Sequence, residues 1–335
     1  MPNTHYDIIA IGNAIVDVLS AASEDFLAEE NINKGSMQLI DADRAEMLYT
    51  KMNAGHEISG GSAANTLVGV AALGGRCAFI GQVADDCLGK VFQHDIRAQN
   101  IDFKVPLRDA EIPTGRCLIL VSPDGERTMN TFLGVAQYLH SEAIQPEMIE
   151  KAAILYLEGY LWDPEQPRAA MREAIKIARK AGRKVALTLS DAFCIERHRD
   201  DFKQLINDGL IDILFANEVE LKSLVQHDDF DRGVSEVAEK LPLLVVTRGP
   251  NGAIAIKDNI RTETLAKKVE RVVDTTGAGD LFAAGFLAGQ ARDLSIAASL
   301  EMGAIAAAEI ISHYGARPER DIKKVIESAL NVSLN

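Results

Sequence analysis

The chain contains 335 residues, of which 47% are hydrophobic and 25% are charged. This length and composition exclude a single small module and a disordered or fibrous chain, and they indicate a globular protein of one large α/β unit or about two folding units. The chain has 49 acidic and 35 basic residues, which gives a formal net charge of −14. Because this charge repels nucleic-acid backbones and anionic lipid, we expect neither nucleic acid nor a membrane as a partner.

The cysteines and the chain start bear on the cellular compartment. Four cysteines are scattered without a Cys-x-x-Cys pair, so neither a disulfide framework nor a zinc site is expected. Met1 to Tyr6 lacks a basic stretch followed by an apolar one, and the uncharged run 281–291 is too short to span a bilayer. We therefore expect a cytoplasmic, untargeted protein.

The first half of the chain predicts strands that do not alternate with helices. Residues 6–12 form a short apolar run ending in Gly, which is typical of a strand buried on both faces of a parallel sheet. Further strands are expected at 36–40, 115–122 and 127–133, the last two joined by a Pro-Asp-Gly-Glu turn. These later strands predict a second, small sheet, which fits a flap over a site and a layer packed on the main domain or on a second subunit equally well.

The second half predicts a parallel sheet flanked by helices. Strand-like runs and helical segments alternate from about residue 151 onward, at 152–160, 165–181, 184–190, 196–207, 211–217 and 243–247, and further helices follow at 280–290, 295–314 and 319–330. Such alternation indicates βαβ crossovers and the α/β class. Because ligands of these sheets bind outside the carboxyl ends of the strands, we look for chemistry directly after each strand.

The sharpest local motif is Asp-Thr-Thr-Gly-Ala-Gly-Asp at 274–280. Its glycines allow a ligand to approach the backbone, and the free N–H groups of the helix that follows favour an anion. Gly277, Ala278 and Gly279 are therefore predicted to form an anion hole, beside which Asp280 accepts a proton from an attacking hydroxyl, as phosphoryl transfer requires. An Asp280 that only caps the helix is the structural alternative.

Other phosphate-binding motifs are excluded. Gly89-Lys90 is followed by Val91 and lacks the earlier glycine of a P-loop. The dinucleotide fingerprint fails because Phe282 stands where a small residue is needed. His198-Arg199-Asp200 mimics a protein-kinase catalytic loop, but the partner motifs of that loop are missing from the sequence.

Together with Gly-Gly-Ser-Ala-Ala-Asn at Gly60–Asn65, the motif at 274–280 resembles the ribokinase (PfkB) carbohydrate and nucleoside kinase family, over about residues 6–317. The resemblance implies a Rossmann-like α/β domain with a small β-sheet lid, ATP as donor, and Mg²⁺; a monovalent cation such as K⁺ stays open. We accordingly expect one kinase domain over residues 1–335. Its lid would come from segments at about 15–40 and 101–133, and the main α/β domain from the remainder.

The resemblance also implies roles for individual residues. Asp280 matches the family's catalytic base and Gly277 to Gly279 its anion hole, with Thr275 on the nucleotide side. Asp17 matches the acid that holds the acceptor hydroxyls, with a solvated turn acid as the alternative. The full set expected around the acceptor on this basis is Asn13, Asp17, Gly60, Gly61 and Asn65.

Further implied roles concern the nucleotide. Asn217 and Glu220 match the element that orders Mg²⁺, with Glu220 acting through water; an exposed helix start is the alternative. Thr247 and Gly249 match the loop beside the nucleotide. In the lid, Arg127 is the cation expected to close over the transferring phosphoryl group, and a turn arginine paired with Asp124 or Glu126 is the alternative.

The stretch after the strand at 184–190 indicates the class of acceptor. Ser190 to Phe193 resembles the Ser-Ala-Pro-Phe stretch of adenosine kinases, whose Phe stacks on the purine, although core packing of Phe193 is about equally favoured. The residues that match the cover of the base in adenosine kinases are Gln38, Met129, Thr131 and Leu133. Asp191 and Ala192 depart from that stretch, and Thr276 is the form common in sugar kinases.

We therefore expect ATP-dependent phosphorylation of adenosine at its 5′-hydroxyl, giving AMP and ADP. The alternatives are a kinase of the same family for ribose, fructose or another carbohydrate, and a catalytically silent nucleotide-binding regulator. The sequence keeps the expected base and the metal-ordering pair, Asp280, Asn217 and Glu220, and a silent protein would have no chemical reason to keep them together. A monomer and a homodimer joined through the lids both fit the resemblance.

Overall fold

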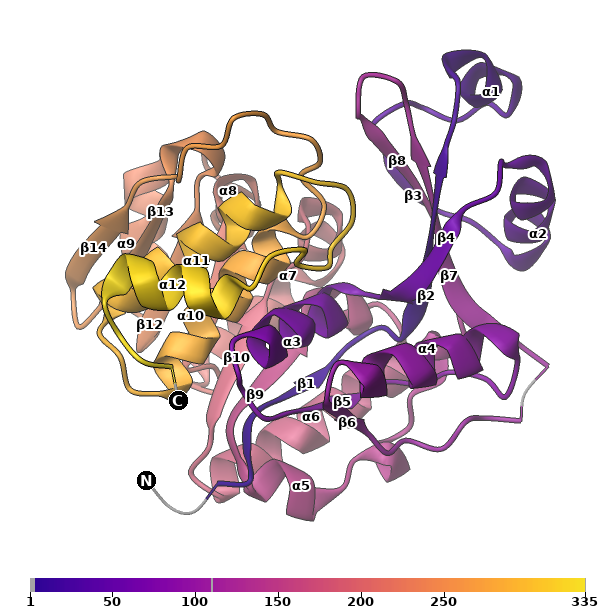
Figure 1. The fold of residues 1–335 in the computed structure, drawn as a ribbon. Coiled ribbons are helices and arrows are strands. Elements are labelled where there is room, and N and C mark those ends of the chain that lie inside the picture. Colours follow the sequence, from indigo (N-terminus) through magenta and orange to yellow (C-terminus); the bar gives the residue numbers. More distant parts are fainter. Residues whose placement is uncertain (1–3, 110, 335) are drawn as a thin grey trace.

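The fold was obtained as a computed structural model, which describes residues 4–109 and 111–334. The expectations that fall on Met1 to Asn3, and on Ala110 within the expected lid segment, lie outside these residues. Two sheets organise the described chain (Figure 1). The larger one confirms the predicted α/β class.

The large sheet is built around the first strand of the chain. Its strands are β1 (Tyr6–Ile11), β5 (Cys77–Ile80), β6 (Ile101–Phe103), β9 (Ala152–Glu158), β10 (Lys184–Thr188), β11 (Ile213–Asn217), β12 (Leu243–Thr247), β13 (Ala253–Lys257) and β14 (Ile260–Thr264). They lie in the order β14-β13-β12-β11-β10-β9-β1-β5-β6, with parallel pairing from β6 to β12 and antiparallel pairing of β13 and β14. Strand β1 is buried almost throughout, as its apolar run predicts.

Helices flank this sheet and the smaller one. Their bounds are α1 (Glu24–Glu29), α2 (Ala42–Lys51), α3 (Ser62–Ala72), α4 (Cys87–Ala98), α5 (Pro146–Glu150), α6 (Glu165–Lys180), α7 (Ala192–Asn207), α8 (Glu218–Val225), α9 (Phe230–Ala238), α10 (Ala278–Ala291), α11 (Ile296–Ile310) and α12 (Ile322–Leu330). Helices α3, α10 and α11 lie over one face of the large sheet, and α5 and α6 lie behind it (Figure 1). None of the helices within 4–109 and 111–334 has both the length and the apolar composition to cross a bilayer.

Helix α10 is buried along most of its length because small residues let its neighbours approach. A Cβ added to Gly285 would lie 2.6 Å from the backbone of Met302 in α11, and one added to Gly289 would lie 2.4 Å from the hydroxyl of Ser299. The small-residue composition of the C-terminal helices therefore reflects close helix packing. This packing holds the N-terminus of α10 in place at the carboxyl ends of the strands.

The order of the strands creates a crevice beside β1. From β1 the chain continues to β5 and β6 on one side, and then returns to β9 on the other. Such a switch point in a parallel sheet is where ligands bind. Asn13, two residues after β1, and Glu158, the last residue of β9, are both buried there.

The small sheet lies over that crevice. Its strands are β2 (Ile15–Ala21), β3 (Met37–Leu39), β4 (His56–Gly60), β7 (Thr114–Val121) and β8 (Arg127–Gly134), in the order β3-β8-β7-β2-β4. The predicted Pro-Asp-Gly-Glu turn joins β7 to β8, and Gly125 takes a φ of +83° there, which favours glycine. Helices α1 and α2 lie beside the sheet, away from the main body (Figure 1).

The composition of the small sheet differs from the expected segments in two places. Strand β4 belongs to it although it lies outside 15–40 and 101–133; its exposed His56 and Glu57 hide the strand pattern, and pairing with β2 fixes it. Conversely, Ile101–Phe103 pairs with β5 at the edge of the large sheet. Ile101 and Phe103 are buried in the core, which draws this segment to the main body.

Candidate active site

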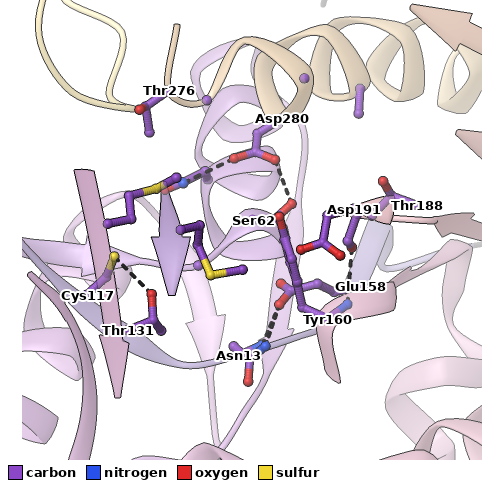
Figure 2. Close-up of a pocket in the computed structure, with 18 of the residues that line it drawn as sticks. Asn13, Ser62, Cys117, Thr131, Glu158, Tyr160, Thr188, Asp191, Thr276 and Asp280 are labelled. Carbon is purple, nitrogen blue, oxygen red and sulfur yellow. Dashed lines mark hydrogen bonds between the residues drawn. The ribbon is translucent and has the colours of Figure 1, made fainter. Parts of the chain in front are cut away.

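A cavity of about 570 Å³ opens between the carboxyl ends of the large sheet and the small sheet. In Figure 2, Asp280 lies on one side of it and Asn13 with Glu158 on another, while Cys117 and Thr131 of the small sheet form a wall. The predicted site residues that line this cavity are Asn13, Asp17, Gly61, Asn65, Met129, Thr131, Leu133, Phe193, Asn217, Glu220, Thr247, Thr275, Gly277, Gly279 and Asp280.

The glycine turn before α10 faces the cavity. Gly277 adopts a φ of +76°, which glycine accommodates without strain, and it caps the helix. The amide of Leu281 donates to the Gly277 carbonyl at 2.8 Å, so the amides of Gly279 and Asp280 precede the start of the helical ladder. An added Cβ on Gly279 would meet nothing within 4 Å, so the turn is open on that side. The turn therefore has the geometry of an anion site.

Two donors from α3 hold the Asp280 carboxylate at the cavity surface (Figure 2). The Ser62 hydroxyl donates to Oδ1 at 2.6 Å, and the Asn65 amide donates to Oδ2 at 3.2 Å. Burial raises the pKa of Asp280, while these two hydrogen bonds and the charge of Arg317 lower it. Asp280 caps neither end of α10, since Gly277 is the N-cap. A carboxylate fixed beside an anion site is suited to accept a proton there.

Asp17 lies on β2 and is 6% exposed. Burial raises its pKa to about 6, against the lowering effect of Arg317 and Arg127. The carboxylate fits because Gly60 pairs across from the start of β2: a Cβ on Gly60 would lie 2.3 Å from Asp17 Cγ. Gly60 itself does not line the cavity, so its predicted contact with an acceptor is replaced by room for the Asp17 side chain.

Glu158 joins two elements of the site at the switch point (Figure 2). Its Oε1 accepts from the Asn13 side-chain amide at 2.7 Å, and its Oε2 accepts from the backbone of Ala63 at 2.8 Å. Burial raises the pKa of Glu158 to about 7. The carboxyl group thus fixes the loop after β1 and the first turn of α3 relative to each other.

The small sheet contributes a largely apolar wall. We call this set the apolar wall: Ile15, Met37, Leu39, Cys117, Ile119, Met129 and Leu133. Thr131 lies on the same strand as Met129 and Leu133 of this wall, and its hydroxyl donates to the Cys117 sulfur at 3.3 Å. Burial raises the pKa of Cys117 to about 12, so the thiol stays neutral and adds to the apolar surface. Such a wall suits a flat, weakly polar group.

Asn217 and Glu220 form a capping box at the start of α8. The Glu220 amide donates to Asn217 Oδ1 at 2.8 Å, and Asn217 Nδ2 donates to Glu220 Oε1 at 2.6 Å. Glu220 is 6% exposed, and burial raises its pKa to about 7. The alternative of an exposed helix start is therefore wrong for Glu220. Among the described residues no three potential metal ligands gather. A single carboxylate on the cavity wall fits a Mg²⁺ that keeps most of its water.

Phe193 lies at the rim of the cavity, away from the small sheet. Its side chain is 64% exposed, so it does not pack in the core. Asp191 caps α7 by accepting from the Cys194 amide at 2.6 Å, so the departure from Ser-Ala-Pro-Phe still places Phe193 in the first turn of a helix. Beside it, Asp163 pairs with Arg197 at 2.6 Å. The rim thus combines one exposed ring with charged pairs.

Arg127 does not face the cavity. Its side chain is 6% exposed and forms an ion pair with Asp274, the first residue of the glycine motif. The alternative, a turn arginine paired with Asp124 or Glu126, is therefore wrong, and the role of Arg127 as a cation that closes over the phosphoryl group stays a prediction. Asp274 also accepts from the amides of Thr276 and Gly315, so the Arg127 guanidinium joins β8 to a loop that is already ordered.

Three further predicted residues lie outside the cavity lining. Gln38 donates to Asn130 at 2.5 Å within the small sheet, because the period of two along β3 turns it away from Met37 and Leu39. Gly249 begins a short 3₁₀ turn beyond β12. Ala278 is the first helical residue of α10 and follows the turn that lines the cavity.

Sequence reasoning missed Glu158, Ser62 and Arg317. Ser62 and Arg317 reach their partners across sequence separations of 218 and 252 residues, which no local pattern reveals. Glu158 did leave a signal, since a Glu that ends a buried apolar strand needs partners for its carboxylate.

Comparison with known proteins agrees with this geometry. Residues 32–322 match the profile described as pfkB family carbohydrate kinase. A structure called a probable sugar kinase from Rhizobium etli is 42% identical, covers 98% of this chain and 100% of its own, and superposes with a TM-score of 0.93. A structure called adenosine kinase from Sinorhizobium meliloti is 45% identical, with 97% and 99% coverage and a TM-score of 0.92.

A third relative comes from plants. Probable fructokinase-7 of Arabidopsis thaliana is 33% identical over 249 residues, which is 71% of either chain. Relatives named for nucleosides and for sugars thus both resemble this chain. The chain belongs to the pfkB family of carbohydrate kinases, and it is a phosphotransferase with an alcohol group as acceptor.

Proposed function

We propose that this kinase transfers the γ-phosphoryl group of ATP to the 5′-hydroxyl of adenosine, giving AMP and ADP. The observation that carries the proposal is one cavity in which Asp17 and Asp280 lie with the apolar wall. A carboxylate accepts hydrogen bonds from ribose hydroxyls, and an apolar wall suits a purine. A free sugar, which is polar all round, would leave that wall uncovered. The 45% identity to the Sinorhizobium meliloti adenosine kinase supports the same acceptor.

The residues of the cavity would divide the reaction between them. Asp17 and Asn65 would hold the ribose, and Asp280 would take the proton of the 5′-hydroxyl. The 5′-oxygen then forms its bond to the γ-phosphorus while the bond from that phosphorus to the β,γ-bridging oxygen breaks. ADP leaves, and the proton remains on the Asp280 carboxyl.

The turn before α10 would stabilise the phosphoryl group during transfer. Amides of Gly277 and Gly279, with the positive end of the α10 dipole, offer hydrogen bonds to its oxygens. Glu220, positioned by Asn217, would hold Mg²⁺ through water, and the ion when bound would neutralise phosphate charge. Thr247, at the end of β12, would lie beside the nucleotide.

Two exposed apolar side chains support a base-binding site. Phe193 is 64% exposed and Leu39 is 54% exposed, and both line the cavity from opposite sides. Apolar surface exposed at a cavity usually marks a ligand site. A ring contact with the purine would contribute about 1–3 kcal/mol.

A sugar kinase is the second candidate. The relatives called fructokinase or probable fructokinase, at 30–33% identity, favour it, and so does Thr276 in the motif. Asp163, Asp191 and Arg197 supply polar groups at the rim that a sugar could use. This function keeps Asp280 and the anion site and changes only the acceptor.

A coupled ADP-release assay and a thermal-shift assay on adenosine, inosine, ribose and fructose would separate the two candidates. We expect adenosine to give the highest kcat/KM and the largest thermal shift. Replacing Met129 in the apolar wall by Asn should lower kcat/KM for adenosine and leave KM for ATP unchanged. Turnover of a free sugar with none of adenosine would reject adenosine as the acceptor.

A further inference from the structure

A guanidinium group from the C-terminal loop lies behind the acceptor side of the site. Arg317 stands between α11 and α12, and its side chain is 18% exposed. Its Nη1 donates to Asn65 Oδ1 at 2.5 Å, and its Nη2 donates to the Ser59 hydroxyl at 2.8 Å and to the Ser59 carbonyl. One side chain thus joins the end of β4, the first turn of α3 and the C-terminal loop.

The contact with Asn65 determines which way its amide points. Because the amide oxygen accepts from Arg317, the amide nitrogen is left to donate to Asp280 Oδ2 at 3.2 Å. The reverse orientation would place the amide oxygen against the Asp280 carboxylate and the NH₂ group against the guanidinium, which loses both hydrogen bonds. Arg317 therefore selects the orientation in which Asn65 is a donor to Asp280.

The charge of Arg317 is shared among acidic groups from several elements. Asp95 of α4 lies 4.0 Å from Nη2, and Asp17 and Asp280 interact with the guanidinium from β2 and α10. Asp280 also interacts with Asp17 and with Tyr156, Glu158 and Tyr160, none of which is a cation. Arg317 is the cation that opposes the effect of burial on the Asp280 pKa.

We propose that Arg317 is a positioning residue for phosphoryl transfer: it fixes the Asn65 amide as a donor to Asp280, which directs that carboxylate at the acceptor hydroxyl. This inference rests on the proposed role of Asp280 as the base, but it does not depend on adenosine being the acceptor. It explains why a partly buried arginine reaches the site from the far end of the chain. A role limited to holding the loops together would not require the amide contact.

The test compares Arg317→Met with Arg317→Lys, and with Arg320→Met as an exposed control on the same loop. With whichever acceptor the wild type turns over, we expect Arg317→Met to move the acidic limb of the kcat/KM profile to higher pH by about one unit, the lower end of the shift that a nearby opposite charge causes. Arg317→Lys should restore part of that shift. KM for ATP should stay within about twofold, because no nucleotide contact is removed.

A second measurement needs no turnover. Carboxyl ¹³C NMR titration, with the Asp280 signal assigned from Asp280→Asn, should show a higher pKa for Asp280 in the Arg317→Met protein. In an Asn65→Ala background, Arg317→Met should lower kcat/KM by a smaller factor than it does in the wild type, as expected for coupled residues. An unmoved acidic limb with an unmoved Asp280 signal would overturn the role of Arg317. Failure of adenosine in the acceptor screen would count against the proposed function alone.

Discussion

Asp280 is the residue on which the proposed chemistry depends, and the two donors from α3 already hold its carboxylate. Asp280→Asn keeps the size of the side chain and removes the proton acceptor. We expect kcat to fall at least about a hundredfold, the usual cost of removing a general base, with ATP affinity retained. Steady-state kinetics and calorimetric ATP titration would measure both. Asp293→Asn, exposed just beyond α10, is the matched control, and an unchanged rate in Asp280→Asn would refute the role of the base.

Gly60 tests the position of Asp17. An alanine there would place its Cβ 2.3 Å from Asp17 Cγ, so the carboxylate must move. Losing a hydrogen bond from a charged group costs about 1.5–3 kcal/mol, so KM for the acceptor should rise about tenfold or more. KM for ATP serves as the internal control. Equal KM values for the acceptor in Gly60→Ala and wild type would show that Asp17 does not contact it.

At the scale of elements, the ion pair of Arg127 and Asp274 joins the small sheet to the glycine motif. Arg127→Met leaves a buried carboxylate without its cation, so the free energy of unfolding should fall by about 3–5 kcal/mol. Chemical denaturation would measure the loss. The double variant Arg127→Met with Asp274→Asn removes both charges and should lose less than the sum of the single variants. Additive losses would show that the two side chains do not interact.

Sequence patterns predicted features that depend on residues close together in the sequence, and they missed features that depend on residues far apart in it. The parallel strands β9 to β12 and the glycine turn at 277–279 depend on neighbours in sequence, and the pattern predicted them, whereas the antiparallel strands β13 and β14 were not predicted. The ion pair of Arg127 was missed because its partner, Asp274, lies on another element far along the chain. Strand β4 was not predicted because its side chains are partly polar, and it is pairing with β2 that makes it a strand. Glu158 was missed because its partners come from the loop after β1 and from the first turn of α3.

For the whole molecule, buried carboxyl groups predict an unusual pH dependence of stability. Burial raises the pKa values of Asp17 to about 6 and of Glu158 and Glu220 to about 7. Between their unfolded values and these pKa values the folded state binds more protons than the unfolded state. The contribution of these groups to the free energy of unfolding therefore falls as pH rises through this window, and is constant above about pH 8.

Glu158→Gln isolates one of these groups. The difference in unfolding free energy between wild type and variant should change by up to about 1.4 kcal/mol per pH unit between pH 5 and 7, in the direction that favours the variant at higher pH. Denaturation at pH 5, 6, 7 and 8 would measure it. Glu239→Gln, an exposed carboxylate beyond α9, should give a difference that does not follow this slope. A pH-independent difference for Glu158→Gln would show that Glu158 is ionised throughout.

The most direct test of the account is a crystal structure of the kinase with adenosine and a non-hydrolysable ATP analogue. We expect the 5′-hydroxyl within hydrogen-bond distance of the Asp280 carboxylate, the terminal phosphate against the amides of Gly277 and Gly279, and the purine on the apolar wall. A nucleoside bound with its 5′-hydroxyl away from Asp280, or a terminal phosphate away from that turn, would contradict it.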